Sequence, residues 1–302
     1  MKGRLKRAYK ELTNTRNRVG YVCLIPSFLH LSFFILFPIL FSLFLSFHRW
    51  DMMSKAKPFV GIGNYIEVLT SETFQISMLN TVYYSVGHIP LLIVTALTLA
   101  LLLNRDIPGK AVYRVSFYIP VITPIVAASI IWMWLYEPNY GIVNFLLRIF
   151  GIVGPPWLKD PTWAMPAVII MRVWKNAGFY MVIYLAALQG IPVSYYEASR
   201  IDGASWWAQI RYITVPLLLP TTFFILVISL IRSFQVFTQI FVMTQGGPLE
   251  STTVVVYYLF VEAFTNFRMG LASAVAYVIF VVILSLTLIQ WRWFGRDSEF
   301  SL

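Results

Sequence analysis

Charged residues are scarce in this sequence. Asp, Glu, Lys and Arg make up only 12% of the 302 residues, whereas apolar residues make up 59% and the mean hydropathy is +0.73. A typical soluble domain carries about 25% charged residues. The composition therefore excludes an ordinary soluble protein, and we interpret the chain as an integral membrane protein.

The residues that build catalytic and metal centres are nearly absent as well. Cys23 is the single cysteine, so no internal disulfide can form and one thiol cannot hold a metal ion. The three histidines, His30, His48 and His88, are isolated, and no HExxH pattern, complete P-loop or GxSxG motif occurs. We expect a non-catalytic chain without a metal or cofactor of its own, with an intramembrane enzyme as an alternative that no motif supports.

Long apolar runs fill most of the sequence. They extend over roughly 20 to 30 residues, enough at about 1.5 Å per helical residue to cross a hydrocarbon layer of about 30 Å. The runs are continuous and do not alternate every second residue, which excludes a β-barrel. We predict an all-α membrane protein with a basic tail over 1–20 and one transmembrane domain over 21–302. The six predicted spans are approximately 21–47, 80–103, 116–136, 164–189, 213–243 and 269–293.

Positive charges lie mainly on one side of these spans. The two terminal tails and the loops after the second and fourth spans carry fourteen Lys or Arg residues, whereas the other three loops carry six. By the positive-inside rule, both termini and the loop 190–212 are predicted to face the cytoplasm. The net charge of +10 is therefore a topology signal, and we expect no nucleic-acid partner.

The loop 190–212 is a polar island between two apolar spans. Ser194 and Glu197 have the spacing of a capping box, which predicts a helix start. Small and apolar residues then recur at helical spacing on one predicted face. These are Ala198, Ile201, Ser205 and Ala208.

Glycine and proline punctuate the same segment. Gly203 permits a bend or a close backbone approach that a side chain would obstruct. Pro216 and Pro220 are expected to shape the entry into the fifth span, because proline is tolerated near a helix start and disruptive deeper inside.

The spacing of this loop resembles that of a known family. Glu197-Ala198-Ser199, then Gly203, then Ile213-Thr214-Val215-Pro216 resembles the EAA loop of permease subunits in binding-protein-dependent ABC importers. Ser199 and Val215 depart from the Ala and Leu that are usual there. The stretch from Glu197 to Ala204 is similar to the subfamily that imports sugars and oligosaccharides. Segments at 59–65, 174–175, 188–192 and 244–248 also resemble such permeases, so the resemblance covers nearly the whole chain.

The resemblance implies the type I importer fold in a bacterial or archaeal cell membrane. It implies a heterodimer with a second, related permease, two copies of a cytoplasmic ATPase that bind ATP and Mg, and an external solute-binding protein. A cytoplasmic coupling helix falls on about Tyr195–Trp207, between the fourth and fifth spans. The residues expected to couple to the ATPase are Glu197, Ala198, Ser199, Asp202, Gly203, Trp206 and Pro216.

Aromatic residues support a docking role for this loop. Tyr195, Tyr196, Trp206 and Trp207 favour contact with a protein surface over exposure to water. The alternative is a helix that lies in the lipid interface, where Tyr and Trp are also favoured. For Glu197, a second alternative is a helix cap without contact to the ATPase.

Three basic residues fall inside predicted spans, where charge is costly and marks a transport pathway or a paired site. Arg172 and Lys175 are predicted near the outer third of the fourth span, where long stems can reach the interface or the binding protein. A structural role is the main expectation for Lys175. Arg232 is predicted near the middle of the fifth span, and none of the three has an acidic partner at helical spacing. If Arg232 faces the cavity, it favours an acidic solute such as a uronate-containing oligosaccharide or a sugar phosphate.

Related sugar permeases contact substrate from the matching stretches of spans four and five. The resulting pathway candidates are Asn176, Ala177, Tyr180, Ser229, Arg232, Ser233 and Gln235. Polar groups beside aromatic rings suit a sugar, although Ser, Asn and Gln in spans also serve as hydrogen-bond partners between helices. We predict half of the pathway of an ATP-driven sugar importer. The alternatives are a permease for a non-sugar solute and a motor-free secondary transporter, although no repeated halves with broken helices are evident.

Overall fold

A computed structural model describes the backbone of residues 15–294 and the side chains of residues 22–292. All regular structure in this range is helical, apart from one isolated bridge between His48 and Phe59. The predicted all-α class is thereby confirmed. The predicted basic tail over 1–20 lies mostly outside the described residues.

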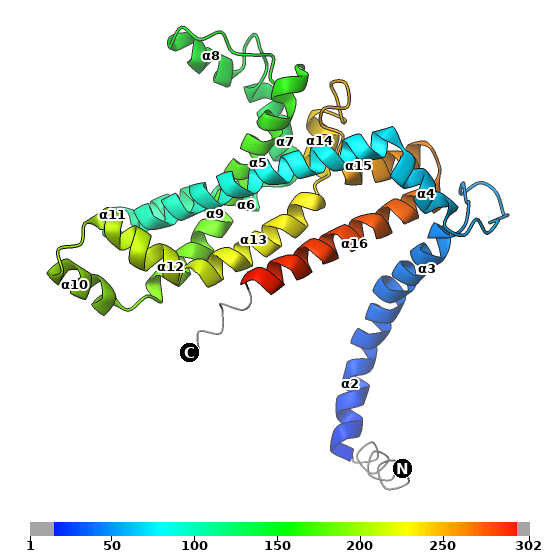
Figure 1. The fold of residues 1–302 in the computed structure, drawn as a ribbon, viewed down its shortest axis with the longest axis horizontal. Helices are drawn as coiled ribbons and strands as arrows, with labels where there is room; N and C mark the ends of the chain where they lie inside the picture. Colours follow the sequence, from blue (N-terminus) through cyan, green and yellow to red (C-terminus); the bar gives the residue numbers. More distant parts are fainter. Residues whose placement is uncertain (1–14, 295–302) are drawn as a thin grey trace.

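Short helices and three π-helical segments (η1–η3) interrupt the long helices (Figure 1). In chain order the elements are α2 (Thr15–Leu31), η1 (Ser32–Leu36), α3 (Phe37–Ser46), α4 (Gly63–Thr70), α5 (Glu72–Leu103), α6 (Lys110–Ile122), α7 (Ile125–Leu135), α8 (Ile142–Ile149), α9 (Pro161–Gln189), α10 (Val193–Ile201), α11 (Trp206–Gln209), η2 (Ile210–Thr214), α12 (Val215–Leu217), α13 (Leu219–Phe234), α14 (Thr238–Met243), α15 (Val255–Phe260), η3 (Val261–Thr265) and α16 (Met269–Phe294).

Four helical stretches in the described range are long and apolar enough to cross a membrane. They are Val22–Ser46, α5, α9 and Met269–Arg292. Two further candidates are helix pairs that bend sharply, so the number of spans is four, or six if each bent pair is one span.

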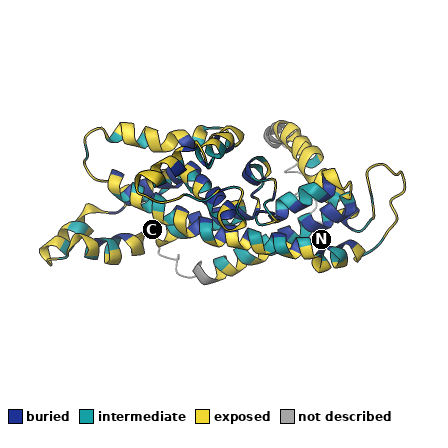
Figure 2. Ribbon diagram, turned by 90° about the horizontal axis from the view of Figure 1, so that it is seen from above, coloured by how far each residue is buried: buried dark blue, intermediate teal, exposed yellow. Residues whose placement is uncertain are grey.

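The centre of the molecule is the contact between α5 and α9, which run side by side (Figure 1). Ala96 and Ala100 of α5 are fully buried, and their small side chains leave room for the buried rings of Tyr180 and Tyr184 on α9. By contrast, only 6% of the most apolar 18-residue window of the first span is buried. α3 contacts α16, whereas α2 extends away from the bundle (Figure 1), and its described side chains are exposed (Figure 2).

The second span begins earlier than the predicted Asn80. Its helix starts at Glu72, because Ser71 caps it by accepting a hydrogen bond from the Phe74 amide at 3.3 Å. The polar residues that suggested a loop are accommodated within the fold. Ser77 is fully buried, and the Asn80 amide donates to the backbone oxygens of Glu250 and Thr253 at 2.8 and 3.0 Å.

The third predicted span is not one helix. α6 and α7 meet at an angle of 101°, with the break at Thr123 and Pro124. Because Pro124 has no backbone N–H and α6 ends at Ile122, the carbonyl groups at the end of α6 are left without helical donors.

Lys175 of α9 satisfies these carbonyls. Its Nζ atom lies 3.1 Å from the oxygen of Pro120, 3.2 Å from that of Val121 and 2.8 Å from that of Thr123, and the residue is only 7% exposed. The structural role expected for Lys175 is confirmed, whereas its expected reach toward the interface is wrong. Gly178 allows this approach, since a Cβ there would overlap the Phe117 carbonyl oxygen.

The fifth predicted span, 213–243, is also interrupted. α13 ends at Phe234, and α14 begins at Thr238. At the other end, the segment Trp206–Leu217 meets α13 at 63°. Pro216 and Pro220 occupy the first turns of α12 and α13, which confirms that prolines shape this entry.

We predict that Lys175→Met destabilises the protein by about 1–3 kcal/mol, because it leaves the carbonyls of the broken span without a donor. Thermal unfolding of the purified protein in detergent measures the effect. Lys55→Met, at an exposed loop position, is the control and should leave the melting temperature unchanged. Equal melting temperatures for the two variants would show that the carbonyls need no lysine.

Candidate functional site

The loop between α9 and α13 forms one end of the bundle, opposite the end that holds α4 (Figure 1). Its exposed surface combines charged and apolar side chains. Glu197 and Asp202 are exposed, Ile201 is 87% exposed and Trp207 is 70% exposed. An apolar residue this exposed beside carboxylates favours contact with another protein.

The predicted coupling helix Tyr195–Trp207 is two helices. α10 ends at Ile201, Gly203 adopts a left-handed φ of +79°, and α11 starts at Trp206. The expected bend at Gly203 is thereby confirmed, whereas the continuous face through Ser205 and Ala208 is wrong.

The predicted capping box is also wrong. Pro192 occupies the N-cap of α10, where no side chain caps the helix, and Ser194 lies within the first turn. The fixed φ of proline presets this helix start. A serine cap forms instead at α11, where Ser205 Oγ accepts a hydrogen bond from the Ala208 amide at 3.3 Å.

A hydrogen-bond network joins α10 to the segment that leads into α13. Gln209 donates through Nε2 to Ser199 Oγ at 2.8 Å and to the backbone oxygen of Tyr196 at 3.3 Å. The Tyr196 hydroxyl lies 3.0 Å from Thr214 Oγ1. Tyr196, Gln209 and Thr214 were not among the predicted coupling residues. The available signal was Ser199 itself, because a hydroxyl in place of the usual Ala requires a partner.

Trp206 connects the loop to the second span. The Arg105 guanidinium, just beyond the end of α5, lies 4.6 Å from the centre of the Trp206 ring, within cation–π range. Both residues line a cavity of about 210 Å³ between α5, α9 and the loop. Ala198 and Pro216 are exposed. The role of all seven predicted residues in coupling stays a prediction.

The predicted pathway residues separate into two groups. Arg232 and Gln235 are exposed and Asn176 is half-buried, whereas the others are packed inside the subunit. The buried ones are Ala177, Tyr180, Ser229 and Ser233. Within α13, both serines turn inward and Arg232 turns outward, so these three candidates do not share one face.

The inward face of α13 meets a histidine. Ser233 Oγ lies 3.1 Å from His88 Nδ1, and the His88 ring stacks on Tyr84 at a centroid distance of 5.3 Å. The Tyr84 hydroxyl accepts a hydrogen bond from Gln239 of α14 at 3.2 Å. For Ser233, the structure supports the alternative role of a hydrogen-bond partner between helices. The contacts of His88 with Ser233 and Tyr84 indicate a packing role for this histidine.

Two arginines, Arg172 on α9 and Arg232 on α13, have no acidic partner among the described residues. Arg172, Asn176 and Phe179 follow one another at helical spacing on α9. The Arg232 guanidinium lies 5.4 Å from the centre of the Phe179 ring. Among the described residues, the ion pairs are Lys159 with Glu137 and Arg268 with Glu67 and Glu262, so neither Arg172 nor Arg232 is neutralised.

The comparison with known families covers the loop between α9 and α13 and the helices that carry the two arginines. A family model described as "Binding-protein-dependent transport system inner membrane component" matches residues 92–294, which include the loop and both arginines. The chain belongs to this family. It is thus a multi-pass membrane component of a transport system, and its relatives are transport subunits without a catalytic role.

Relatives and solved structures match over nearly full length. The trehalose/maltose transport system permease protein MalF of Thermococcus litoralis is 35% identical over 278 residues, which cover 91% of this chain and 93% of the relative. A bacterial ABC transporter involved in the import of the acidic polysaccharide alginate matches with a TM-score of 0.84 and 26% identity, covering 97% of this chain and 100% of that one. The alginate transporter in complex with an alginate pentasaccharide-bound periplasmic protein matches with a TM-score of 0.83 and 25% identity, covering 98% and 100%.

We predict that Gly203→Val uncouples transport from ATP hydrolysis, because a β-branched residue disfavours the left-handed conformation by about 1–2 kcal/mol. Solute-stimulated ATPase activity of the purified complex measures the effect. Gly151→Val is the matched control, since Gly151 also has a positive φ, of +74°, and no atom within 4 Å of an added Cβ, but lies outside the loop. Equal loss in both variants would point to general destabilisation.

Proposed function

We propose that this chain is one transmembrane subunit of an ATP-driven importer that takes up a sugar or oligosaccharide delivered by an external solute-binding protein. The trehalose/maltose relative and the alginate transporter support the substrate class. The structure with a periplasmic protein supports the binding-protein partner. A second, related permease supplies the other half of the pathway, and two ATPase copies bind the ATP and Mg.

The proposed topology has six spans in one domain over 21–302, with both termini cytoplasmic. Counting each bent pair as one span supports this number. The charge asymmetry of the loops supports the orientation. In this orientation, the loop with α10 faces the cytoplasm of a bacterial or archaeal cell, and the end with α4 faces outward.

Coupling proceeds through the exposed surface of α10. Glu197, Ala198 and Asp202 contact the ATPase, and its movement displaces α10. The bonds from Gln209 to Ser199 and Tyr196 carry this displacement to α13, and the Arg105–Trp206 contact carries it to α5. The 87% exposure of Ile201 supports a surface that contacts another protein. A secondary transporter has no ATPase subunit to make this contact.

The solute is proposed to be acidic, such as a uronate-containing oligosaccharide or a sugar phosphate. The observation that carries this proposal is the pair of unneutralised arginines, the half-buried Arg172 on α9 and the exposed Arg232 on α13. An unpaired charge inside a membrane is costly, and an anionic solute in the pathway compensates it. Asn176 supplies hydrogen bonds to hydroxyls, and Phe179 offers a ring to a sugar face. The alginate transporter is a precedent among similar proteins.

We predict that Arg172→Gln and Arg232→Gln each lower uptake of an acidic oligosaccharide about tenfold, the effect of losing one charge-assisted hydrogen bond. Uptake of a neutral oligosaccharide of equal length should stay within about twofold. Proteoliposomes with the complete complex and internal ATP provide the measurement. Arg148→Gln is the control, because Arg148 donates its hydrogen bonds to backbone oxygens of residues 138, 139 and 144.

Equal loss of acidic and neutral uptake would contradict the acidic substrate. Loss of complex assembly would show that the partner permease supplies the missing acids instead. Uptake that persists without ATP and without the ATPase would contradict the importer itself.

A further inference from the structure

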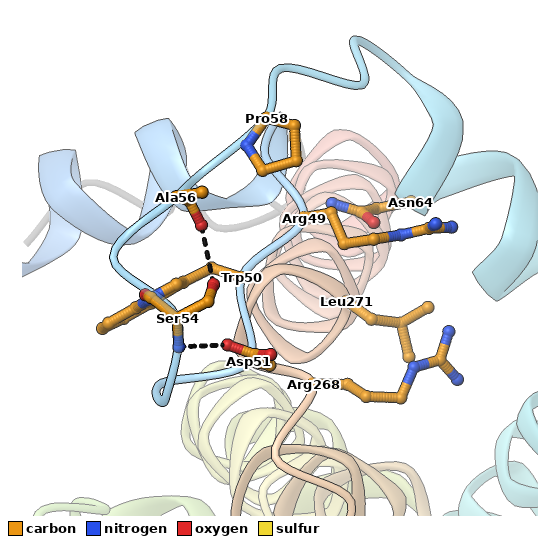
Figure 3. A pocket seen from close by; sticks show the side chains of 9 residues that line it. All are labelled: Arg49, Trp50, Asp51, Ser54, Ala56, Pro58, Asn64, Arg268 and Leu271. Carbon is orange, nitrogen blue, oxygen red and sulfur yellow. Dashed lines mark hydrogen bonds between the residues drawn. The ribbon is translucent and has the colours of Figure 1, made fainter.

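A pocket lies at the end of the bundle opposite the coupling loop, where the segment after α3 folds over the start of α16 (Figure 3). Its volume is about 500 Å³. Figure 3 shows the Arg49 and Arg268 side chains extending in the same direction, with Leu271 between them. Trp50, Asp51, Ser54, Ala56, Pro58 and Asn64 complete the lining.

The floor of this pocket is firmly built. Asn64 is 4% exposed, and its amide donates to the backbone oxygens of Ser46 and His48 at 2.8 and 3.0 Å. The Gly270 amide donates to the Trp50 oxygen at 3.3 Å, and a Cβ at Gly270 would overlap the His48 carbonyl. A pocket with a fixed floor can hold a ligand group with little loss of conformational entropy.

The two arginines of the pocket differ in their partners. Arg268 forms ion pairs with Glu67 and Glu262, so its charge is neutralised. Among the described residues, neither an ion pair nor a side-chain hydrogen bond engages the guanidinium of Arg49, which is exposed. Arg49 is therefore the group in the pocket that is free to bind an anion.

The acidic residue of the pocket does not satisfy Arg49. Asp51 Oδ1 accepts hydrogen bonds from the backbone amides of Ser54 and Met53 at 2.7 and 3.2 Å. These bonds, chiefly that from Ser54, lower the pKa of Asp51. Lys57 lies 4.7 Å from the centre of the Trp50 ring and adds a positive charge beside the pocket.

We propose that this pocket is the docking point for an acidic side chain of the solute-binding protein, with Arg49 as the group that binds its carboxylate. The inference rests on the proposed function, which places this end of the bundle outside the cell. Arginine suits the task because its planar guanidinium binds a carboxylate through two parallel hydrogen bonds. Trp50 contributes an amphipathic ring at the rim, a residue type that is enriched in protein interfaces.

The experiment measures binding of the purified solute-binding protein, loaded with its solute, to the complete transporter in nanodiscs. Three variants are compared with the wild type: Arg49→Glu, Arg49→Gln and Lys55→Glu. Lys55→Glu makes the same charge change in the same loop but does not line the pocket. We expect Arg49→Glu to raise Kd at least about tenfold, Arg49→Gln less, and Lys55→Glu less than about threefold.

Four results would overturn the inference while leaving the proposed function intact. The first is an equal effect of Arg49→Glu and Lys55→Glu, which would indicate a diffuse charge effect. The second is no change in Kd for any variant. The third is loss of heterodimer assembly in Arg49→Glu, which would assign the pocket to the second permease. The fourth is binding of a free acidic oligosaccharide at this pocket without the binding protein. Failure of the wild-type transporter to bind any solute-binding protein would instead contradict the proposed function.

Discussion

The contact between Lys175 and the three carbonyl oxygens at the break between α6 and α7 is the interaction on which the arrangement of the spans depends. A bend of 101° in apolar surroundings exposes backbone groups that lipid cannot satisfy. A single ammonium group provides three donors at this position. Lys175 thereby permits α7 to leave the direction of α6, and it binds the end of α6 to α9, the central helix of the molecule.

The polar residues of α9 have different roles. Lys175 and Gly178 contact α6 and fulfil structural roles, whereas Arg172 and Asn176 are only half-buried. Lys175 and Asn176 are adjacent in the sequence, and neighbouring positions on a helix rotate by about 100°, so their side chains leave α9 in different directions. One helix thus binds the end of a broken span and presents polar groups to the proposed pathway. The loop between α9 and α13 also combines two roles. Gln209 forms internal hydrogen bonds, while the outer surface of the loop is exposed.

The helical class, the long spans and the bend at Gly203 were predictable from the sequence, because they depend on local composition and on a conformation that glycine favours. The breaks in the third and fifth spans were not, although Pro120 and Pro124 were visible, since a proline in a span can also be tolerated without a break. The inward orientation of Ser233 involves a contact with His88, which lies far away in the chain. Ser194 shows the reverse case, in which a suitable local motif lost to Pro192, one position before the helix.

The first span has a consequence for how the chain can be altered. Its attachment to the bundle is at α3, where the Tyr277 hydroxyl donates to the Ile39 oxygen at 2.6 Å and Ser42 lies 3.4 Å from the same hydroxyl. None of the three core clusters among the described residues contains a side chain from 22–43. By contrast, Leu45 and Ser46 at the end of α3 are buried. Substitutions in residues 22–43 are therefore expected to change contacts with lipid or a partner more than the internal packing of this subunit, whereas changes at Leu45 and Ser46 would disturb the interior.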